Sequence, residues 1–151
     1  MSYRAADARR QLLDEVAGAA ENIGVALVAL SEAYERMDER AADRLESSLF
    51  RPVQAAYGRA QRAHNGFAER VGLATRTFAA PPARLPTDPR HGIEQAADAL
   101  RTADETLATL QDSMLPVEVG DPELRADLSH VRELIAPLPG AAREIVRTLG
   151  R

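Results

Sequence analysis

Apolar residues recur at alternating steps of three and four along most of this chain, in four separate stretches. This spacing places them on one side of an α-helix, and such a stripe packs helices side by side at shallow angles. One stretch runs without a break from Phe50 to Phe78, and the others span residues 13–41, 93–114 and 124–149. The pattern predicts an all-α protein with the architecture of an antiparallel four-helix bundle.

Aspartate–proline pairs mark where two of these helices begin. Asp88-Pro89 and Asp121-Pro122 each place an N-cap aspartate before a proline in the first helical position. The proline-rich stretch AAPPARLPTDP, residues 79–89, is predicted to be a stiff, extended connection between the second and third helices.

Three prolines fall inside the helical stretches. Pro52 either follows a tight turn near residues 47–51, which we prefer, or kinks one long helix. Pro137 and Pro139 interrupt the fourth helix, yet its apolar stripe continues, so we expect a kink or short break with both halves on the core. The first helix is then about 40 residues, or roughly 60 Å, and should extend beyond the others or carry a second partner.

Composition agrees with helices and excludes several chemistries. A chain of 151 residues is typical of one domain, taken as residues 1–151. Alanine is abundant and aromatic rings are few, which favours closely packed helices over a sheet. The chain has no cysteine, which excludes disulfides, thiolate metal sites and cysteine nucleophiles. All nineteen basic residues are arginine, which excludes a lysine Schiff base.

The N-terminal residues and the apolar runs predict a cytoplasmic location. The opening sequence MSYRAADARRQ lacks the apolar core of a signal peptide. The longest apolar run, Ile23–Leu30, is much shorter than the about 20 residues that span a bilayer. We therefore expect a protein of the cytoplasm with no membrane contact.

Charge is unevenly distributed along the chain. Residues 48–90 hold seven arginines against two acidic residues, a balance of +5. The flanks are acidic, with six arginines against ten acidic residues in 1–47 and six against eleven in 91–151. The total of −4, the lack of aromatic residues among the arginines and the lack of a DNA-binding motif argue against a nucleic-acid partner.

The usual metal motif of helical bundles is missing. Di-iron bundles use Glu-x-x-His pairs, and the nearest pattern here is reversed, from His130 to Glu133. Acidic residues near the end of the first stripe alternate with arginines, as in the pair Glu32–Arg36, which predicts a solvated helix face. We expect no metal, no cofactor and, without a nucleophile–base pair, no catalytic residue.

His64 lies in the middle of the second apolar stripe. That position predicts a core histidine that is hydrogen-bonded to a partner on another helix. Tyr34 and Tyr57 also lie on stripes and could supply the partner, because a buried phenol needs a hydrogen bond too. These three residues form the core polar site that the sequence suggests.

The segment AHNGFAERVG, residues 63–72, resembles the histidine segment of histidine phosphotransfer domains. These small helical bundles carry one phosphorylatable, solvent-exposed histidine in mid-helix, which would be His64 here. The family's lysine and glycine, three and four residues after the histidine, are Phe67 and Ala68 in this chain. A ligand-binding or phosphotransfer-like bundle that uses His64 is therefore the alternative function.

The opposite side of the second helix is basic and contains two glycines. A glycine inside a helix costs about 1 kcal/mol relative to alanine, and it permits close approach of another backbone. We expect this face to point outward and to bind an acidic protein partner, with a solvated basic face as the alternative. The proposed partner-binding residues are Arg59, Arg62, Arg70, Gly58 and Gly66, with Arg51 on the same side.

The first helix is apolar nearly all round between residues 23 and 30. Val25 and Val28 lie opposite its stripe, and Gly24 adds a small flank suited to close helix contact. A helix that is apolar all round is usually buried all round. The sequence therefore predicts a non-enzymatic helical bundle that acts through protein–protein contact, as a homodimer joined at Val25, Val28 and Gly24.

Overall fold

The computed structural model describes residues 3–79 and 88–149, and every regular element in them is helical. The elements are α1 (Tyr3–Glu35), α2 (Glu39–Leu45), the π-helical turn η1 (Glu46–Phe50), α3 (Arg51–Arg70), α4 (Pro89–Asp112), α5 (Leu115–Glu118), α6 (Pro122–Ile135) and α7 (Leu138–Leu149). The all-α class predicted from the spacing of apolar residues is confirmed.

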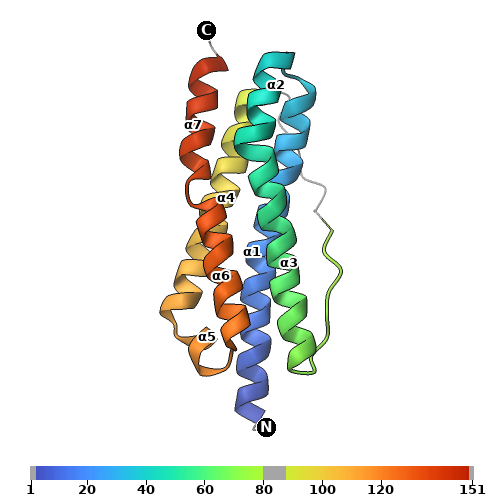
Figure 1. Ribbon diagram of the computed structural model, residues 1–151, viewed down its shortest axis with the longest axis vertical. Helices are drawn as coiled ribbons and strands as arrows, with labels where there is room; N and C mark the ends of the chain where they lie inside the picture. The colour runs from blue at the N-terminus through green and yellow to red at the C-terminus, as the bar shows by residue number, and fades with distance from the viewer. Residues whose placement is uncertain (1–2, 80–87, 150–151) are drawn as a thin grey trace.

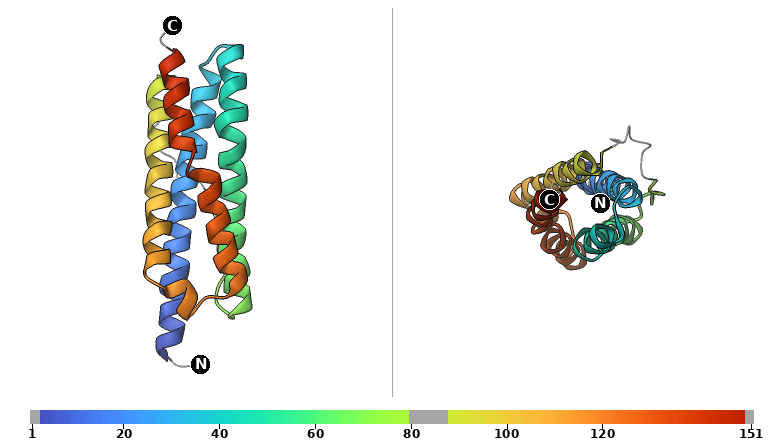
Figure 2. Two further views of the ribbon diagram at one scale, coloured as in Figure 1. Left: turned by 60° about the vertical axis from the view of Figure 1, so that its left-hand side comes forward. Right: turned by 90° about the horizontal axis from the view of Figure 1, so that it is seen from above.

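The long helices lie side by side along one axis (Figure 1). α1 rises from the N-terminal end, the rod formed by α2, η1 and α3 descends, α4 also descends, and α6 and α7 rise again (Figures 1 and 2). α1 packs against α3 and α4, α6 packs against α3, and α7 packs against α4. Within the described ranges α3 and α4 do not touch each other. The first turns of α1 extend beyond the other rods, as expected (Figure 2).

The core is apolar along the whole axis and rich in alanine, with Phe67 its largest fully buried side chain. α1 and α4 approach closely where Gly92 faces Ala29 and Ala33. A Cβ atom on Gly92 would lie 3.4 Å from both the Ala29 backbone oxygen and the Ala33 Cβ. Small side chains therefore set the distance between these two helices.

The first helix is shorter than predicted. α1 has 33 residues and ends at Glu35, and the turn that follows it precedes Glu39. Asp38 caps the next helix, because its carboxylate accepts a hydrogen bond from the Ala41 backbone N–H at 2.9 Å. The turn predicted near residues 47–51 is therefore wrong. The apolar stripe continues across the real turn, and a local cap ends the helix there.

Pro52 lies inside a continuous helical rod. The preceding residues, Glu46–Phe50, form the π-helical turn η1, in which the Arg51 N–H bonds to the Glu46 carbonyl. A proline has no N–H to donate, and its ring clashes with the carbonyl four residues earlier, here that of Ser48. The wider turn relieves that conflict, so the alternative in which one helix passes through Pro52 is the correct one.

The break predicted at Pro137 and Pro139 is present. α6 ends at Ile135 and α7 begins at Leu138, and Figure 2 shows the two helices displaced from each other. Ile135 and Leu138 are both buried, so both halves lie on the core as expected.

The two predicted Asp-Pro helix starts are confirmed. Asp88 accepts from the Arg90 N–H at 3.0 Å, and Asp121 accepts from the Leu124 N–H at 2.8 Å. Most of the predicted extended connection, residues 80–87, lies outside the described residues. One further helical turn, α5, lies between α4 and Asp121 and was not predicted from the sequence.

Candidate functional site

His64 is buried in α3, with 4% of its surface exposed. Its Nδ1 atom lies 2.8 Å from Oδ1 of Asn65, and its ring meets the Phe78 ring edge-on with centroids 5.4 Å apart. The predicted burial is therefore correct. The predicted partner on another helix is wrong, because the partner is the next residue along the same helix.

The residues after α3 fold back along it, and we call residues 71–79 the return segment. Gly72 ends α3 with φ +73°, and the Leu73 N–H bonds to the Ala68 carbonyl at 2.8 Å. These two features form a Schellman cap, for which glycine is the preferred residue. The cap turns the chain so that the return segment passes His64.

Asn65 holds the return segment in place. Its Nδ2 atom donates to the Arg76 carbonyl at 2.9 Å, and its Oδ1 atom accepts from the Arg76 N–H at 2.9 Å. The Arg76 side chain continues to Glu21 on α1, with an ion-pair distance of 2.9 Å. One asparagine and one arginine thus tie α3, the return segment and α1 together.

These hydrogen bonds also decide which nitrogen of His64 carries the proton. The Arg76 N–H can only donate, so the Asn65 atom that faces it must be the oxygen. The same oxygen faces Nδ1 of His64, which must therefore donate to it. In the neutral ring the proton sits on Nδ1, and Nε2 keeps its lone pair as an acceptor.

Burial lowers the pKa of His64, and the positive charge of Arg76 acts in the same direction. The hydrogen bond to Asn65 and the negative charge of Asp14 oppose the shift without cancelling it. Since an unperturbed histidine titrates near about 6.5, the ring is neutral at pH 7.

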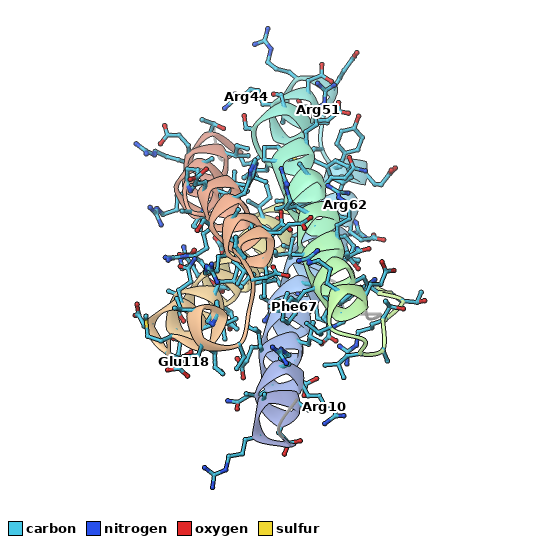
Figure 3. All side chains as sticks on the ribbon, turned by 60° about the horizontal axis from the view of Figure 1, so that its bottom comes forward. Arg10, Arg44, Arg51, Arg62, Phe67 and Glu118 are labelled. Carbon is cyan, nitrogen blue, oxygen red and sulfur yellow. The ribbon has the colours of Figure 1, made fainter. Side chains whose placement is uncertain are left out.

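A hollow of about 290 Å³ opens beside this ring, between α1, α3 and the return segment. It is lined by Arg10, Leu13, Asp14, His64, Leu73, Ala74, Thr75 and Arg76. Figure 3 shows Arg10 on α1, on the side where α3 ends. Two arginines, a carboxylate and a neutral imidazole therefore converge from three separate segments.

His64 lines this hollow, and its Nε2 atom is left free by the hydrogen bond at Nδ1. In the described part of the chain, one side-chain oxygen or nitrogen is fully buried without a hydrogen-bond partner, and this atom is the Gln95 amide oxygen and not His64 Nε2. Nε2 has no hydrogen-bond partner among those residues and is not fully buried. The hollow therefore offers an acceptor nitrogen next to guanidinium donors, which suits a small polar ligand.

The arginines predicted to point outward from α3 divide into two groups. Arg59 pairs with Asp127 of α6 at 3.2 Å, and Arg70 pairs with Asp121 at 2.7 Å and with Glu123 at 3.1 Å. Both therefore pair with acidic residues in α6 or at its N-cap within the same chain, while Arg70 is exposed as expected and Arg59 is half-buried. Arg62 is exposed as expected, and Figure 3 shows it on α3 together with Arg51.

Gly58 and Gly66 are explained by these arginines. A Cβ atom on Gly58 would lie 3.1 Å from Nη1 of Arg62, and one on Gly66 would lie 3.1 Å from Nη1 of Arg70. Each glycine gives room to the guanidinium of the residue four positions later. The binding of an outside partner at these two glycines remains a prediction.

The predicted self-association face contacts the protein itself at two points. Gly24 is buried, and a Cβ atom there would lie 3.1 to 3.3 Å from the Tyr57 ring of α3. This close approach lies inside the molecule, which corrects the role predicted for Gly24. Val25 and Val28 are half-buried and share a helix face with Glu21, where Arg76 of the return segment binds.

The two tyrosines lie away from His64. Tyr57 is half-buried against Gly24, and burial raises its pKa, opposed by its hydrogen bond with Gln61. Tyr34 is 36% exposed near the end of α1, where a hollow of about 230 Å³ lies next to Phe50. Neither tyrosine bonds to His64, so the predicted three-residue polar site does not form.

A second hollow, which the sequence analysis did not predict, lies between α4 and α7. It has a volume of about 430 Å³ and an apolar floor formed by Ala97, Ala142 and Val146. Its α4 edge carries the acidic residues Glu94 and Asp98 together with Arg101, and its α7 edge carries Arg143 and Arg147.

Two further features bear on function. Among residues 3–79 and 88–149, no group of three His, Asp or Glu side chains is arranged to hold a metal ion. α1 is long and apolar enough to cross a membrane by length and composition, but 56% of its most apolar window is buried in the protein. A core helix gives the same pattern, so this is weak evidence for a membrane span.

Comparison of this chain with protein-family models, curated proteins and solved structures found no match.

Proposed function

We propose that this protein is a non-enzymatic, antiparallel four-helix bundle that binds a small polar ligand beside His64. The bundle is one domain, in which a long connection between α3 and α4 joins two rods that run in the same direction. The paths of the helices in Figures 1 and 2 and their packing partners support this arrangement.

One observation carries the ligand site: a buried histidine with a free acceptor nitrogen lines a hollow with charged walls. The Asn65 hydrogen bonds hold the ring in one orientation and one tautomer. The hollow brings Arg10 and Asp14 from α1 together with Arg76 from the return segment. Sites of this kind combine shape with a few convergent polar groups, often including a residue with a shifted pKa.

Phosphotransfer by His64 has less support than binding. A histidine that receives a phosphoryl group from a partner protein must be accessible to it, and His64 is 4% exposed. The return segment lies against it through Phe78 and Arg76. A small ligand can enter the hollow, whereas a protein donor needs an open helix face.

The binding proposal is tested by nuclear magnetic resonance on the ¹⁵N-labelled full chain. Four groups of small fragments are added, namely anions, cations, zwitterions and neutral polar molecules. We expect at least one group to shift the amide signals of Asn65, Thr75 and Arg76 together. His64→Gln should abolish these shifts, whereas the control His91→Gln, an exposed histidine of α4, should keep them. If no group moves these three signals in the wild type, the proposal is rejected.

A homodimer is the second candidate, and the hollow between α4 and α7 favours it over the valine face of α1. A two-fold axis would bring the basic α7 edge of one copy to the acidic α4 edge of the other. Within the described chain, neither Glu94 nor Arg143 forms an ion pair, so both are available for such a contact. The apolar floor would supply the buried area.

Sedimentation at micromolar concentration tests the dimer. Glu94→Arg and Arg143→Glu should each dissociate it, and the double variant should restore it, because the pair is then reversed. Val28→Glu tests whether the dimer forms through the valine face of α1 and not through the hollow between α4 and α7. Dissociation by Val28→Glu alone would move the interface to α1, and a monomeric wild type would reject both faces.

Arg62 remains a candidate for an acidic protein partner. It is exposed and, among the described residues, has no ion pair, unlike Arg59 and Arg70. If Arg62→Glu leaves every captured partner in place, this surface is only solvated.

A further inference from the structure

We propose that the hollow beside His64 binds an oxyanion that carries a proton, namely inorganic hydrogen phosphate. This inference rests on the ligand site proposed above and names the class of its ligand. It follows from the combination of donors and acceptors on the walls, taken one at a time.

The positive charge comes from two arginines on different segments. Arg10 lies on α1 and Arg76 on the return segment, and both line the hollow. A guanidinium offers a planar pair of N–H donors, which fits two oxygens of a phosphate. Two such groups on different segments can bind one anion from two directions.

Both arginines can turn to a ligand at little cost. Arg10 is paired with Asp7 and Arg76 with Glu21, at 3.2 and 2.9 Å. All four side chains are between 44 and 58% exposed. Exposed ion pairs of this kind stabilise a protein only weakly, so exchanging one for a ligand contact is nearly neutral.

The acceptors decide which oxyanion fits. Nε2 of neutral His64 has a lone pair and no proton, and the carboxylate of Asp14 lines the same hollow. An anion without a proton, such as sulfate, could donate to neither acceptor and would be repelled by Asp14. A phosphate with a P–O–H group can donate to one of them while its other oxygens bind the arginines.

The size of the hollow agrees with a small anion. A volume of about 290 Å³ holds roughly ten water molecules at their share of liquid volume. A phosphate fits in it with several waters. A nucleotide would extend out of the hollow into solvent.

Inorganic phosphate and sulfate are titrated into the ¹⁵N-labelled full chain at equal ionic strength at pH 7.5. We expect phosphate to shift the Asn65, Thr75 and Arg76 amide signals with at least about tenfold higher affinity than sulfate, because only phosphate can donate a hydrogen bond to one of the two acceptors. Equal affinities at pH 7.5, or a preference for sulfate, would overturn the proposal.

Three variants identify the contributing groups. Arg10→Gln and Arg76→Gln should each weaken phosphate binding by about tenfold or more, whereas the matched control Arg62→Gln, on the outer face of α3, should not. Asp14→Asn replaces an acceptor with a group that can donate, and it should raise sulfate affinity relative to phosphate. Because Arg10 and Asp14 are exposed, these variants fold whether or not the proposal holds.

The outcomes separate this inference from the function on which it rests. If neutral or cationic fragments shift the three signals and phosphate does not, the phosphate site is rejected and the ligand-binding function stands. If neither the fragments nor phosphate shift them, both are rejected.

Discussion

α1 has two interfaces of opposite character. Toward α4 it presents small apolar residues, and the helices approach until a Cβ atom on Gly92 would touch the Ala29 backbone. Toward α3 and the return segment it presents Arg10, Asp14 and Glu21, and the contact encloses a hollow with a buried histidine on one wall. The first interface is thus a close contact between small side chains and backbone.

The difference shows how one helix can serve two purposes. A dry contact of alanines and glycine fixes the position of α1, because close packing resists any change of volume. A rigid α1 can then hold polar groups at a constant distance from α3, which is what a preformed site requires. Four changes would break or sharpen this comparison.

The largest expected effect belongs to the dry interface. Gly92→Leu would force a side chain between α4 and α1 and should lower the free energy of unfolding by about 3 kcal/mol. Chemical denaturation measures the change. The control is Gly18→Ala on α1, where an added Cβ meets nothing within 4 Å. That variant should gain up to about 1 kcal/mol from helix propensity. Equal effects in the two variants would show that α1 and α4 are not closely packed.

The polar interface should depend most on Asn65. Asn65→Ala removes its two hydrogen bonds with Arg76 and its bond with His64, and should lower stability by about 2 kcal/mol. The Arg76 amide proton should then exchange faster with solvent. Asn22→Ala, which removes one side-chain bond to the Gly18 carbonyl, is the control and should cost about 0.5 kcal/mol. Unchanged exchange at Arg76 would mean that other contacts hold the return segment.

A smaller effect distinguishes the arginines of α3. Arg70 makes two hydrogen bonds to Asp121, the residue that caps α6. Arg70→Ala should therefore cost about 1 kcal/mol, since the pair is only about one-third exposed and is bidentate. Arg62→Ala, without an ion pair in the described residues, should change stability by less than about 0.5 kcal/mol. A larger loss from Arg62→Ala than from Arg70→Ala would reverse the assignment.

The smallest expected effect is one of pH. Because burial lowers the folded-state pKa of His64, the unfolded chain binds its proton more readily. His64 contributes its full stabilisation of the folded state at pH values above its ordinary, unfolded-state pKa of about 6.5. This stabilisation is lost as the pH falls from there toward the lower pKa of the folded state. It is limited in size, because Asn65 and Asp14 partly offset the effect of burial.

His64→Gln should flatten the dependence of unfolding free energy on pH between 8 and 5. The control His91→Gln, which removes an exposed histidine of α4, should leave the steeper slope of the wild type. A wild-type stability that rises on acidification through this range would contradict the direction of the pKa shift.

The sequence was enough to predict the helices and their buried faces, since these follow from a local pattern of apolar residues. The turn before Glu39 was missed because the apolar stripe continues across it, and only the Asp38 cap marked the end of α1. His64 was correctly expected to be buried. Its partner Asn65 is adjacent in sequence, but nothing local signals that the chain folds back so that Arg76 meets it.

The other walls of the hollow could not be predicted from local pattern. Arg10 and Asp14 lie on the exposed side of α1, and they line one hollow with His64 because α3 and the return segment lie beside α1 there. The ion pairs of Arg59 and Arg70 were missed for the same reason. The prediction treated α3 as an isolated helix, whereas α6 packs beside it with acidic residues in reach.

The π-helical turn η1 has a consequence for changes of chain length. A π-helical turn contains one more residue than an α-helical turn, and the helix before and after it still turns the same side toward the core. Removing one residue elsewhere in this rod would rotate everything after it by about 100° and take Phe67 and His64 off the core. Removal of Ser47 would only tighten the turn, provided that Pro52 is also replaced. A one-residue deletion in this rod should therefore be tolerated best at residues 46–50, in a chain in which Pro52 is also replaced.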